Sequence, residues 1–196
     1  MRRQTRRQRV VWSHSWCACS GRGAPVYWGR RLYSRQVCRS FDAAAQDTKS
    51  VGGRFKAPYM KLAIISDIHS NLPALTRALR TIESYRVDEI YCVGDIVGYG
   101  ADPGPCVDLV REYCKASVMG NHDEAVSLNR GIESLPRAGQ KAASHNRSRL
   151  NDGQLEYLSN LPMRLEAQGC TFVHATPQSP QDWMRIDSLV HVHDQF

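Results

Sequence analysis

Three short segments place metal-binding side chains at the end of an apolar run, and their residue types favour chemistry on divalent cations. They span positions 61–69, 90–95 and 117–123, and they carry Asp67, His69, Asp95, Asn121, His122 and Asp123. Carboxylate, imidazole and amide groups together form a mixed nitrogen and oxygen donor set. Such a set suits Mn, Fe, Zn or similar first-row ions better than a pure Ca²⁺ or Mg²⁺ cage. The segments therefore predict a metal site.

These segments could hold a pair of cations, with Asp95 as the carboxylate that bridges them. Asp67 and His69 are two residues apart, so both can turn towards one ion, and Asp95 lies beside Gly94, where backbone and phosphate oxygens can come close. Two ions about 3.5–4 Å apart would share a hydroxide and hold an in-line displacement at phosphorus. We expect His122 to protonate the leaving oxygen and Asp123 to orient the His122 ring.

The elements that must position these residues follow from the hydrophobic pattern. Each of the three segments is typical of a buried strand, and ligands of open α/β sheets bind outside the carboxyl ends of the strands. An amphipathic helix is predicted after Asn71, through Leu72, Leu75, Leu79, Ile82 and Tyr85, and another around 103–114. Alternating strands and helices imply parallel βαβ units. Asn151 and Gln154 predict a capping box for a later helix, and strands near 163–166 and 170–173 lead to His174.

In order along the chain, Asp67-x-His69, Gly94-Asp95-x4-Gly100, Gly120-Asn121-His122-Asp123 and His174 resemble the motifs of the calcineurin-like metallophosphoesterase superfamily. The flanking sequence resembles its small bacterial phosphodiesterase/phosphatase branch. This resemblance implies a four-layer α/β/β/α sandwich, incomplete here at the C-terminus. It also implies two divalent ions, Mn²⁺ first, with Fe, Zn, Ni or Mg as alternatives. Asp67 and His69 would hold one ion, Asn121 and His174 the other, and Asp95 would bridge them.

The resemblance also implies an activity and leaves an alternative. The expected function is metal-dependent hydrolysis of phosphate mono- or diesters by a metal-bound hydroxide. The superfamily normally closes its site with a later Gly-His-x-His, which this chain lacks up to Phe196. His191 and His193 lack the preceding glycine, so we interpret them as surface residues and predict a truncated chain. A non-catalytic interaction module with an incomplete metal site is the alternative.

The expected substrate is a small phosphoester or nucleotide. The superfamily's protein Ser/Thr phosphatases carry a phosphate-gripping arginine in the loop that corresponds to residues 96–100, and this chain has no cation there. That difference favours small phosphodiesters, nucleotides or dinucleoside polyphosphates over phosphoproteins. The oligomeric state cannot be inferred from the sequence.

The first 59 residues differ in composition from the rest. They hold 13 Lys and Arg against two acids, a net charge of +11, whereas residues 60–196 hold 13 against 17, a net of −4. Three interpretations are open: a misassigned start with Met60 as the true first residue, an organellar transit peptide, or a basic tail. We predict that 1–59 is a basic, disordered extension and that 60–196 is the metallophosphoesterase domain, lacking its C-terminal part. The expected location is cytoplasmic, or an organelle such as the mitochondrion if the segment is a transit peptide.

Two further classes of interaction are not favoured. No apolar run approaches the 18 residues of a membrane span, and the acidic balance after Met60 argues against a nucleic-acid surface on the folded domain. The seven cysteines include no zinc-type pair, and buried reduced thiols are favoured over a disulfide framework.

Overall fold

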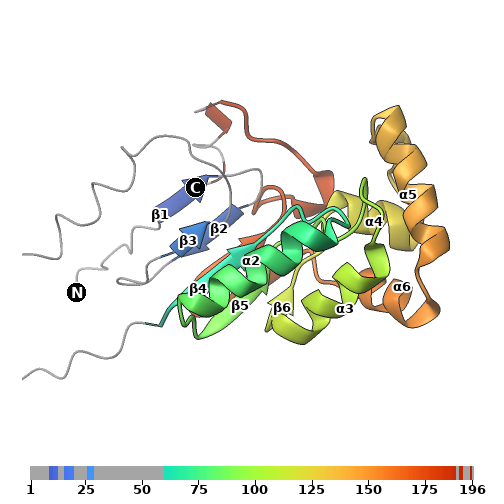
Figure 1. Cartoon of the computed structure of the whole chain (residues 1–196). Coiled ribbons are helices and arrows are strands. Elements are labelled where there is room, and N and C mark those ends of the chain that lie inside the picture. The colour runs from blue at the N-terminus through green and yellow to red at the C-terminus, as the bar shows by residue number, and fades with distance from the viewer. Residues whose placement is uncertain are drawn as a thin grey trace, which may run out of the picture.

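The computed structural model describes residues 60–188, 190–191 and 195, and the backbone of 9–12, 16–19 and 26–28. Two four-stranded sheets form its centre (Figure 1). The parallel sheet has the order β3-β4-β5-β6, with β3 at Val26–Trp28, β4 at Leu62–Ile65, β5 at Glu89–Cys92 and β6 at Ala116–Ser117. The antiparallel sheet has the order β1-β2-β8-β7, with β1 at Arg9–Trp12, β2 at Trp16–Cys19, β7 at Arg164–Ala167 and β8 at Cys170–Val173.

Two helices connect the parallel strands and follow the predicted signals. Helix α2 spans Leu72–Ser84; Asn71 caps it by accepting a hydrogen bond from the backbone N–H of Ala74 at 3.1 Å. Helix α3 spans Pro103–Tyr113 and begins with proline, which has no N–H to leave unsatisfied at that position. The βαβ connections predicted from periodicity are therefore confirmed.

The remaining helices gather beyond the carboxyl end of the parallel sheet (Figure 1). They are α4 at Asn121–Leu128, α5 at Arg137–Arg149 and α6 at Asp152–Ser159, with short 3₁₀ turns η1 at Ile132–Ser134 and η2 at Pro180–Asp182. The predicted capping box of α6 is present, because Asn151 and Gln154 each accept a hydrogen bond from the other's backbone N–H.

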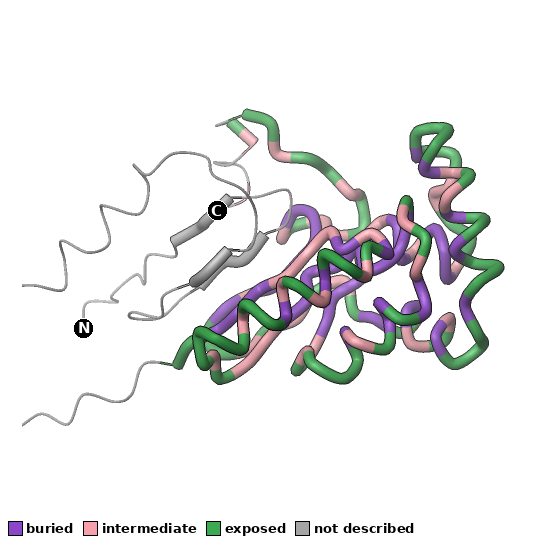
Figure 2. Tube along the Cα trace, viewed as in Figure 1, coloured by how far each residue is buried: buried purple, intermediate pink, exposed green. Residues whose placement is uncertain are grey.

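Two apolar clusters hold the layers together, and the burial pattern in Figure 2 follows them. The larger one lies where helices pack on the parallel sheet. The smaller one lies between the sheets, where the rings of Tyr91 from β5 and Phe172 from β8 stack at 4.6 Å. The predicted α/β fold, with two sheets packed face to face, is confirmed.

Three observations concern the other predictions about the chain. No described helix has the length and apolar character needed to cross a bilayer. Cys92, Cys106 and Cys114 are free, as expected, and burial raises the pKa of the Cys106 and Cys114 thiols to about 12. Cys170 is disulfide-bonded, contrary to the expectation of reduced thiols throughout. Most of 1–59 lies outside the described residues, so its assignment as an extension stays a prediction.

Candidate metal centre

Two loops that leave neighbouring strands form the floor of the candidate site. The loop after β4 carries Asp67 and His69, and the loop after β5 carries Asp95. They run side by side, because the backbone N–H groups of Asp67 and His69 donate to the carbonyls of Gly94 and Asp95 at 3.1 and 3.0 Å. Parallel strands end at one edge of the sheet, so the fold brings these two segments together as predicted.

The backbone of these loops adopts an uncommon conformation. Asp67, His69 and Asp95 have φ angles of 53°, 49° and 54°, in the left-handed region that costs a non-glycine residue about 1–3 kcal/mol. Such a conformation persists only where surrounding contacts enforce it. Residues in this state cluster at functional sites, so the strain itself indicates that side-chain direction matters here.

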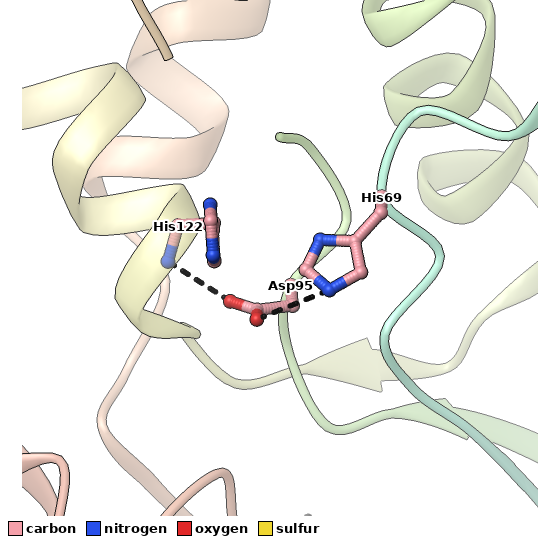
Figure 3. A group of neighbouring side chains, drawn as sticks. All are labelled: His69, Asp95 and His122. Atoms are coloured by element: carbon pink, nitrogen blue, oxygen red, sulfur yellow. Dashed lines mark hydrogen bonds and ion pairs between the residues drawn. The ribbon is translucent and has the colours of Figure 1, made fainter. Parts of the chain in front are cut away.

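Asp95 lies at the centre of the site (Figure 3). Its side chain is 4% exposed, and one carboxylate oxygen accepts a hydrogen bond from the backbone N–H of His122 at 2.9 Å. The other oxygen lies 3.7 Å from Nε2 of His69 and 3.5 Å from Nε2 of His174. Burial opposes ionisation, but the three surrounding imidazoles outweigh it and lower the pKa of Asp95. The buried carboxylate is therefore held in its anionic form.

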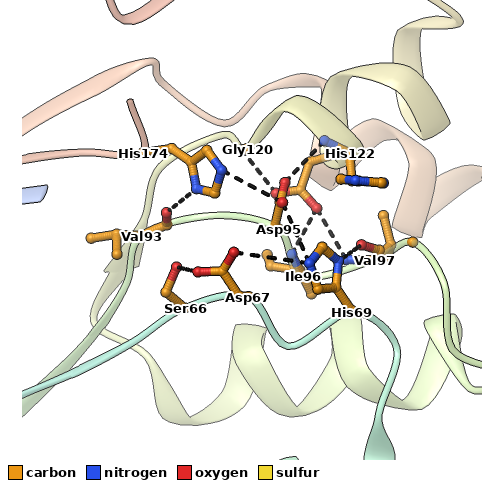
Figure 4. Close-up of polar contacts among 12 residues, drawn as sticks. Ser66, Asp67, His69, Val93, Asp95, Ile96, Val97, Gly120, His122 and His174 are labelled. Atoms are coloured by element: carbon orange, nitrogen blue, oxygen red, sulfur yellow. Dashed lines mark hydrogen bonds and ion pairs between the residues drawn. The ribbon is translucent and has the colours of Figure 1, made fainter. Parts of the chain in front are cut away.

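Two histidines point the same ring nitrogen at Asp95 (Figure 4). Nδ1 of His174 lies 2.7 Å from the carbonyl oxygen of Val93, and Nδ1 of His69 lies 3.2 Å from that of Val97. A carbonyl only accepts, so each Nδ1 carries a proton and each Nε2 faces the site. This is the arrangement by which metal-binding histidines are oriented.

The donor atoms form two groups that share Asp95. One contains Asp67, Asp95 and His174, and the other contains His69, Asp95 and His122; in each, the possible ligand atoms lie within 4.8 Å of one another. The structure thus brings together five of the seven residues predicted for the site. His122 falls within one of these groups, although the sequence predicted only a proton-transfer role for it.

His174 comes from the other sheet. It follows β8 and is 7% exposed. Its burial opposes protonation, but the adjacent Asp95 carboxylate dominates and raises the pKa of His174 to about 9. A cation between these residues would take the place of that proton, so the residues present fit a metal ion.

Small residues leave room around the donors. A Cβ at Gly120 would collide with the backbone nitrogen and carboxylate of Asp95. A Cβ at Gly98, where φ is +96°, would lie 2.6 Å from Nδ1 of His122. That Nδ1 is buried and has no hydrogen-bond partner, so the ring is positioned by packing. Burial lowers the pKa of His122.

Asp123 differs from its predicted role. Its buried carboxylate accepts hydrogen bonds from the backbone N–H groups of Ile96, Val97 and Gly120 at 2.9, 3.1 and 3.0 Å, rather than from the His122 ring. Burial, with the nearby charge of Asp95, raises the pKa of Asp123 to about 7. Backbone N–H groups in the Asp95 loop and at the start of α4 have no partner within their own elements, and they donate to this carboxylate instead. Asp123 therefore fastens the Asp95 loop to α4.

The other predicted residues are placed as follows. Asn121 is the first residue of α4 and is half-buried, and its role as a ligand stays a prediction. His191 pairs with Asp187 at 3.0 Å, and His193 lies outside the described residues.

Two residues make contacts around the site that the sequence analysis did not predict. Arg147 donates to the carbonyls of Val126 and Ser127 at 2.6 and 2.7 Å, at the end of α4. Trp183 donates to Glu124 at 2.9 Å, and its ring meets His174 edge-on at 5.9 Å. These contacts join segments far apart in the chain, which periodicity cannot reveal.

Comparison with known proteins gives the class of this fold and site. A family model described as calcineurin-like phosphoesterase matches residues 60–194, and the chain belongs to this family. The resemblance inferred from the motifs is therefore confirmed.

Individual relatives agree with this assignment. An uncharacterized protein of Methanocaldococcus jannaschii is 38% identical over 126 residues, which cover 62% of this chain and 52% of that protein. The crystal structure of a metallophosphoesterase from Sphaerobacter thermophilus matches with a TM-score of 0.51 and 38% identity, covering 62% of this chain and 49% of that one. A hypothetical protein from Pyrococcus horikoshii, with a TM-score of 0.54, 22% identity and coverage of 66% and 61%, shares the fold. The chain spans about half the length of the first two relatives.

Proposed function

We propose that this chain hydrolyses small phosphate mono- or diesters, using two divalent cations held around Asp95. The observation that carries the proposal is that one buried carboxylate belongs to both groups of donors. A residue shared in this way suits a bridging ligand of a two-metal site. Mn²⁺ is the first choice for a site that mixes imidazoles and carboxylates, with Fe, Zn, Ni or Mg as alternatives.

The chain's own residues divide into those that hold the ions and those that act on substrate. Asp67, His69, Asp95 and His174 supply donors, and Asn121 completes the proposed set. Bound ions of this kind activate water and stabilise charge on the phosphoryl oxygens. The side chains of Asp67 and His69 are 32% and 24% exposed, whereas those of Asp95 and His174 are almost covered, so substrate approaches from the Asp67 and His69 side.

His122 is the proposed proton donor to the leaving oxygen. Its buried ring keeps one nitrogen without a partner and lies 4.9 Å, between ring centres, from His69. A general acid must reach the atom that it protonates, and it need not bind a metal ion. His122 also falls within a group of possible metal ligands, so the test of its role must separate proton transfer from metal binding.

Tyr99 supports a substrate with an organic leaving group. The residue is 48% exposed, and its ring lies 5.0 Å from that of His69 and 4.7 Å from that of His122. One side of the ring thus packs on the site while the rest meets solvent. An aromatic face there suits a nucleoside or another flat group, and the loop offers no cation for a second phosphate.

The test is hydrolysis of bis-p-nitrophenyl phosphate against p-nitrophenyl phosphate by chelator-treated protein to which Mn²⁺ is returned. We expect turnover to depend on the added ion, and the ratio of the two rates to report diester or monoester preference. Absence of metal-dependent turnover, together with absence of Mn²⁺ binding in calorimetry, would refute the proposal. Mn²⁺ binding without turnover would instead support the interaction-module alternative.

A further inference from the structure

Helix α5 carries a buried amide that contacts both loops of the candidate site. Asn146 is 0% exposed. Its Oδ1 accepts hydrogen bonds from the hydroxyl of Ser70 at 2.6 Å and from the backbone N–H of Gly98 at 2.7 Å. Its Nδ2 donates to the carbonyl of Gly100 at 2.9 Å. A buried polar group is tolerated only when it is hydrogen-bonded, and each of these bonds goes to a loop of the site.

The bonded positions adjoin the residues that the proposed function uses. Ser70 follows His69 directly, and it shares the left-handed backbone of that loop with a φ of 54°. Gly98 and Gly100 flank Tyr99, and the carbonyl of Val97, just before them, orients the His69 ring. One buried side chain therefore bonds both to the loop that carries His69 and to the loop that carries Asp95 and Tyr99.

The rest of the inner face of α5 is shaped for close approach. Gly139, Ala143 and Asn146 are spaced by four and three residues, which places them on one face of the helix, and all three are buried. A Cβ at Gly139 would lie 3.3 Å from the hydroxyl of Tyr99 and 3.5 Å from Cε1 of His122. A larger residue there would push these rings, so the small residues allow α5 to lie directly against the site.

Helix α5 also forms hydrogen bonds to α4, the helix that carries His122. Arg147 donates to two carbonyls at the end of α4, where carbonyls lack partners within their own helix. Adjacent residues of α5 thus bind three segments of the site: the Ser70 loop, the Gly98–Gly100 loop and α4.

We propose that Asn146 is a positioning residue of the metal centre. Through its three hydrogen bonds α5 holds the two ligand-bearing loops in a fixed relative position, and we call this set of bonds the clamp. This inference rests on the proposed function, because it assigns the clamp to metal binding. The two loops already share backbone hydrogen bonds, so the amide is not their only connection. What the amide adds is a set of buried side-chain hydrogen bonds to both loops, and the strained backbone of both loops requires such external support.

The first test is Mn²⁺ titration calorimetry on the intact chain carrying Asn146→Ala. Loss of a group that orients metal ligands typically weakens metal binding about 10–100-fold, and we expect a loss in this range. The matched control is Asn151→Ala, which removes an asparagine whose side chain accepts a hydrogen bond from the backbone N–H of Gln154 within the cap of α6. This control reports the effect of lost helix stability alone, and we expect its Mn²⁺ affinity to stay within about twofold of the unsubstituted chain's.

A second measurement tests the role of Asn146 in the metal-free chain. Hydrogen–deuterium exchange on the metal-free chain should speed up across residues 66–71 and 94–100 in Asn146→Ala but not in Asn151→Ala. Ser70→Ala removes one of the three bonds and should give a smaller increase, with a smaller loss of affinity.

The outcomes separate the clamp from the proposed function. Equal Mn²⁺ affinities for Asn146→Ala and Asn151→Ala, or unchanged exchange in both loops, would overturn the clamp while leaving the metal site intact. If the unsubstituted chain binds no Mn²⁺, the proposed function fails, and with it the role of Asn146 in metal binding. Faster exchange in that case would show only a structural tether.

Discussion

The two ends of the parallel sheet differ in a way that shows where function is concentrated. At the amino ends of β5 and β6, a wide hollow of about 910 Å³ lies between the ends of α2 and α3. Its lining mixes cations such as Arg86 with acids such as Glu83 and Glu112. The opposite end has buried charge instead of open volume: Asp95, His122, Asp123 and His174 are each less than 9% exposed.

This contrast teaches that free volume is a poor guide to chemistry in this fold. Solvated side chains of both signs at the amino ends cost little free energy. Burying four ionisable groups at the carboxyl ends costs free energy. The side chains of Asp95, Asp123 and His174 are ion-paired or hydrogen-bonded, whereas the His122 ring keeps a buried nitrogen without a hydrogen-bond partner. The comparison predicts that equivalent substitutions will have very different effects at the two ends.

The largest difference is expected for the change of carboxylate to amide. Asp95→Asn removes a negative charge common to both donor groups, so we expect metal-dependent turnover to be abolished, exceeding the loss of about 100-fold that follows removal of an outer-shell partner. The control is Asp88→Asn, an exposed residue that lines the hollow and accepts a hydrogen bond from the backbone of Lys61. Its turnover should be unchanged. Similar rates for the two variants would remove the distinction between the ends.

The second prediction concerns His122. His122→Ala should lower kcat by about 10²–10⁴ for alkyl phosphodiesters, whose leaving oxygen needs a proton. The loss should be much smaller for p-nitrophenyl esters, whose leaving group departs as a stable anion. Rates for both substrate types at saturating Mn²⁺ provide the measurement. An equal loss for both would assign His122 to metal binding instead.

The third prediction concerns pH. In the metal-free protein the pKa of His174 is about 9, so at pH 7 its Nε2 carries a proton that a cation must displace. Mn²⁺ affinity should therefore rise about tenfold per pH unit from pH 7 and level off above pH 9, with one proton released from this group. Calorimetry in buffers of different ionisation enthalpy counts the protons. Affinity independent of pH would contradict the placement of an ion at His174.

The fourth prediction compares two tyrosines of equal exposure. Tyr99 beside the site is 48% exposed, and Tyr113 beside the hollow is 49% exposed. Tyr99→Ala should raise KM for esters with aromatic or nucleoside groups by up to about tenfold, the scale of one aromatic contact. It should leave dimethyl phosphate kinetics nearly unchanged. Tyr113→Ala should alter neither, and a matching effect from both would show that Tyr99 does not contact substrate.

The smallest effect is expected for Arg86 at the hollow. Its φ of 50° is left-handed without any role in the site. Arg86→Gly relieves a strain of about 1–2 kcal/mol, partly offset by the greater flexibility of glycine in the unfolded chain. We expect a free energy of unfolding unchanged or higher by up to about 1 kcal/mol, measured by urea denaturation, with normal turnover. A clear loss of stability or rate would show that the amino end has a function of its own.

The sequence predicted the parts of the site that depend on local pattern. Asp67, His69 and Asp95 follow strands of the parallel sheet, whose topology brings such positions together. His174 was predicted because it directly follows β8, although β8 belongs to the other sheet. The caps at Asn71 and Asn151 depend on residues only three positions away, so they too were predictable.

The parts that were missed depend on contacts between distant segments. Asn146 bonds to residues 76 and 48 positions away, and no periodic signal marks such pairs. The small residues Gly139 and Ala143 on the same face of α5 were the available signal. Sequence proximity to His122 suggested that Asp123 orients the His122 ring, whereas its carboxylate accepts hydrogen bonds from the backbone N–H groups of the Asp95 loop and of Gly120.

The position of His174 on the second sheet has a consequence for how the metal site assembles. Asp67, His69 and Asp95 follow strands of one sheet, whereas His174 follows β8 of the other. The donor set closes only when the sheets dock through the stacked rings of Tyr91 and Phe172. A bound cation would thus link the two sheets once they have docked. Phe172→Ala, which removes packing between the sheets, would then weaken cation binding without changing any ligand residue.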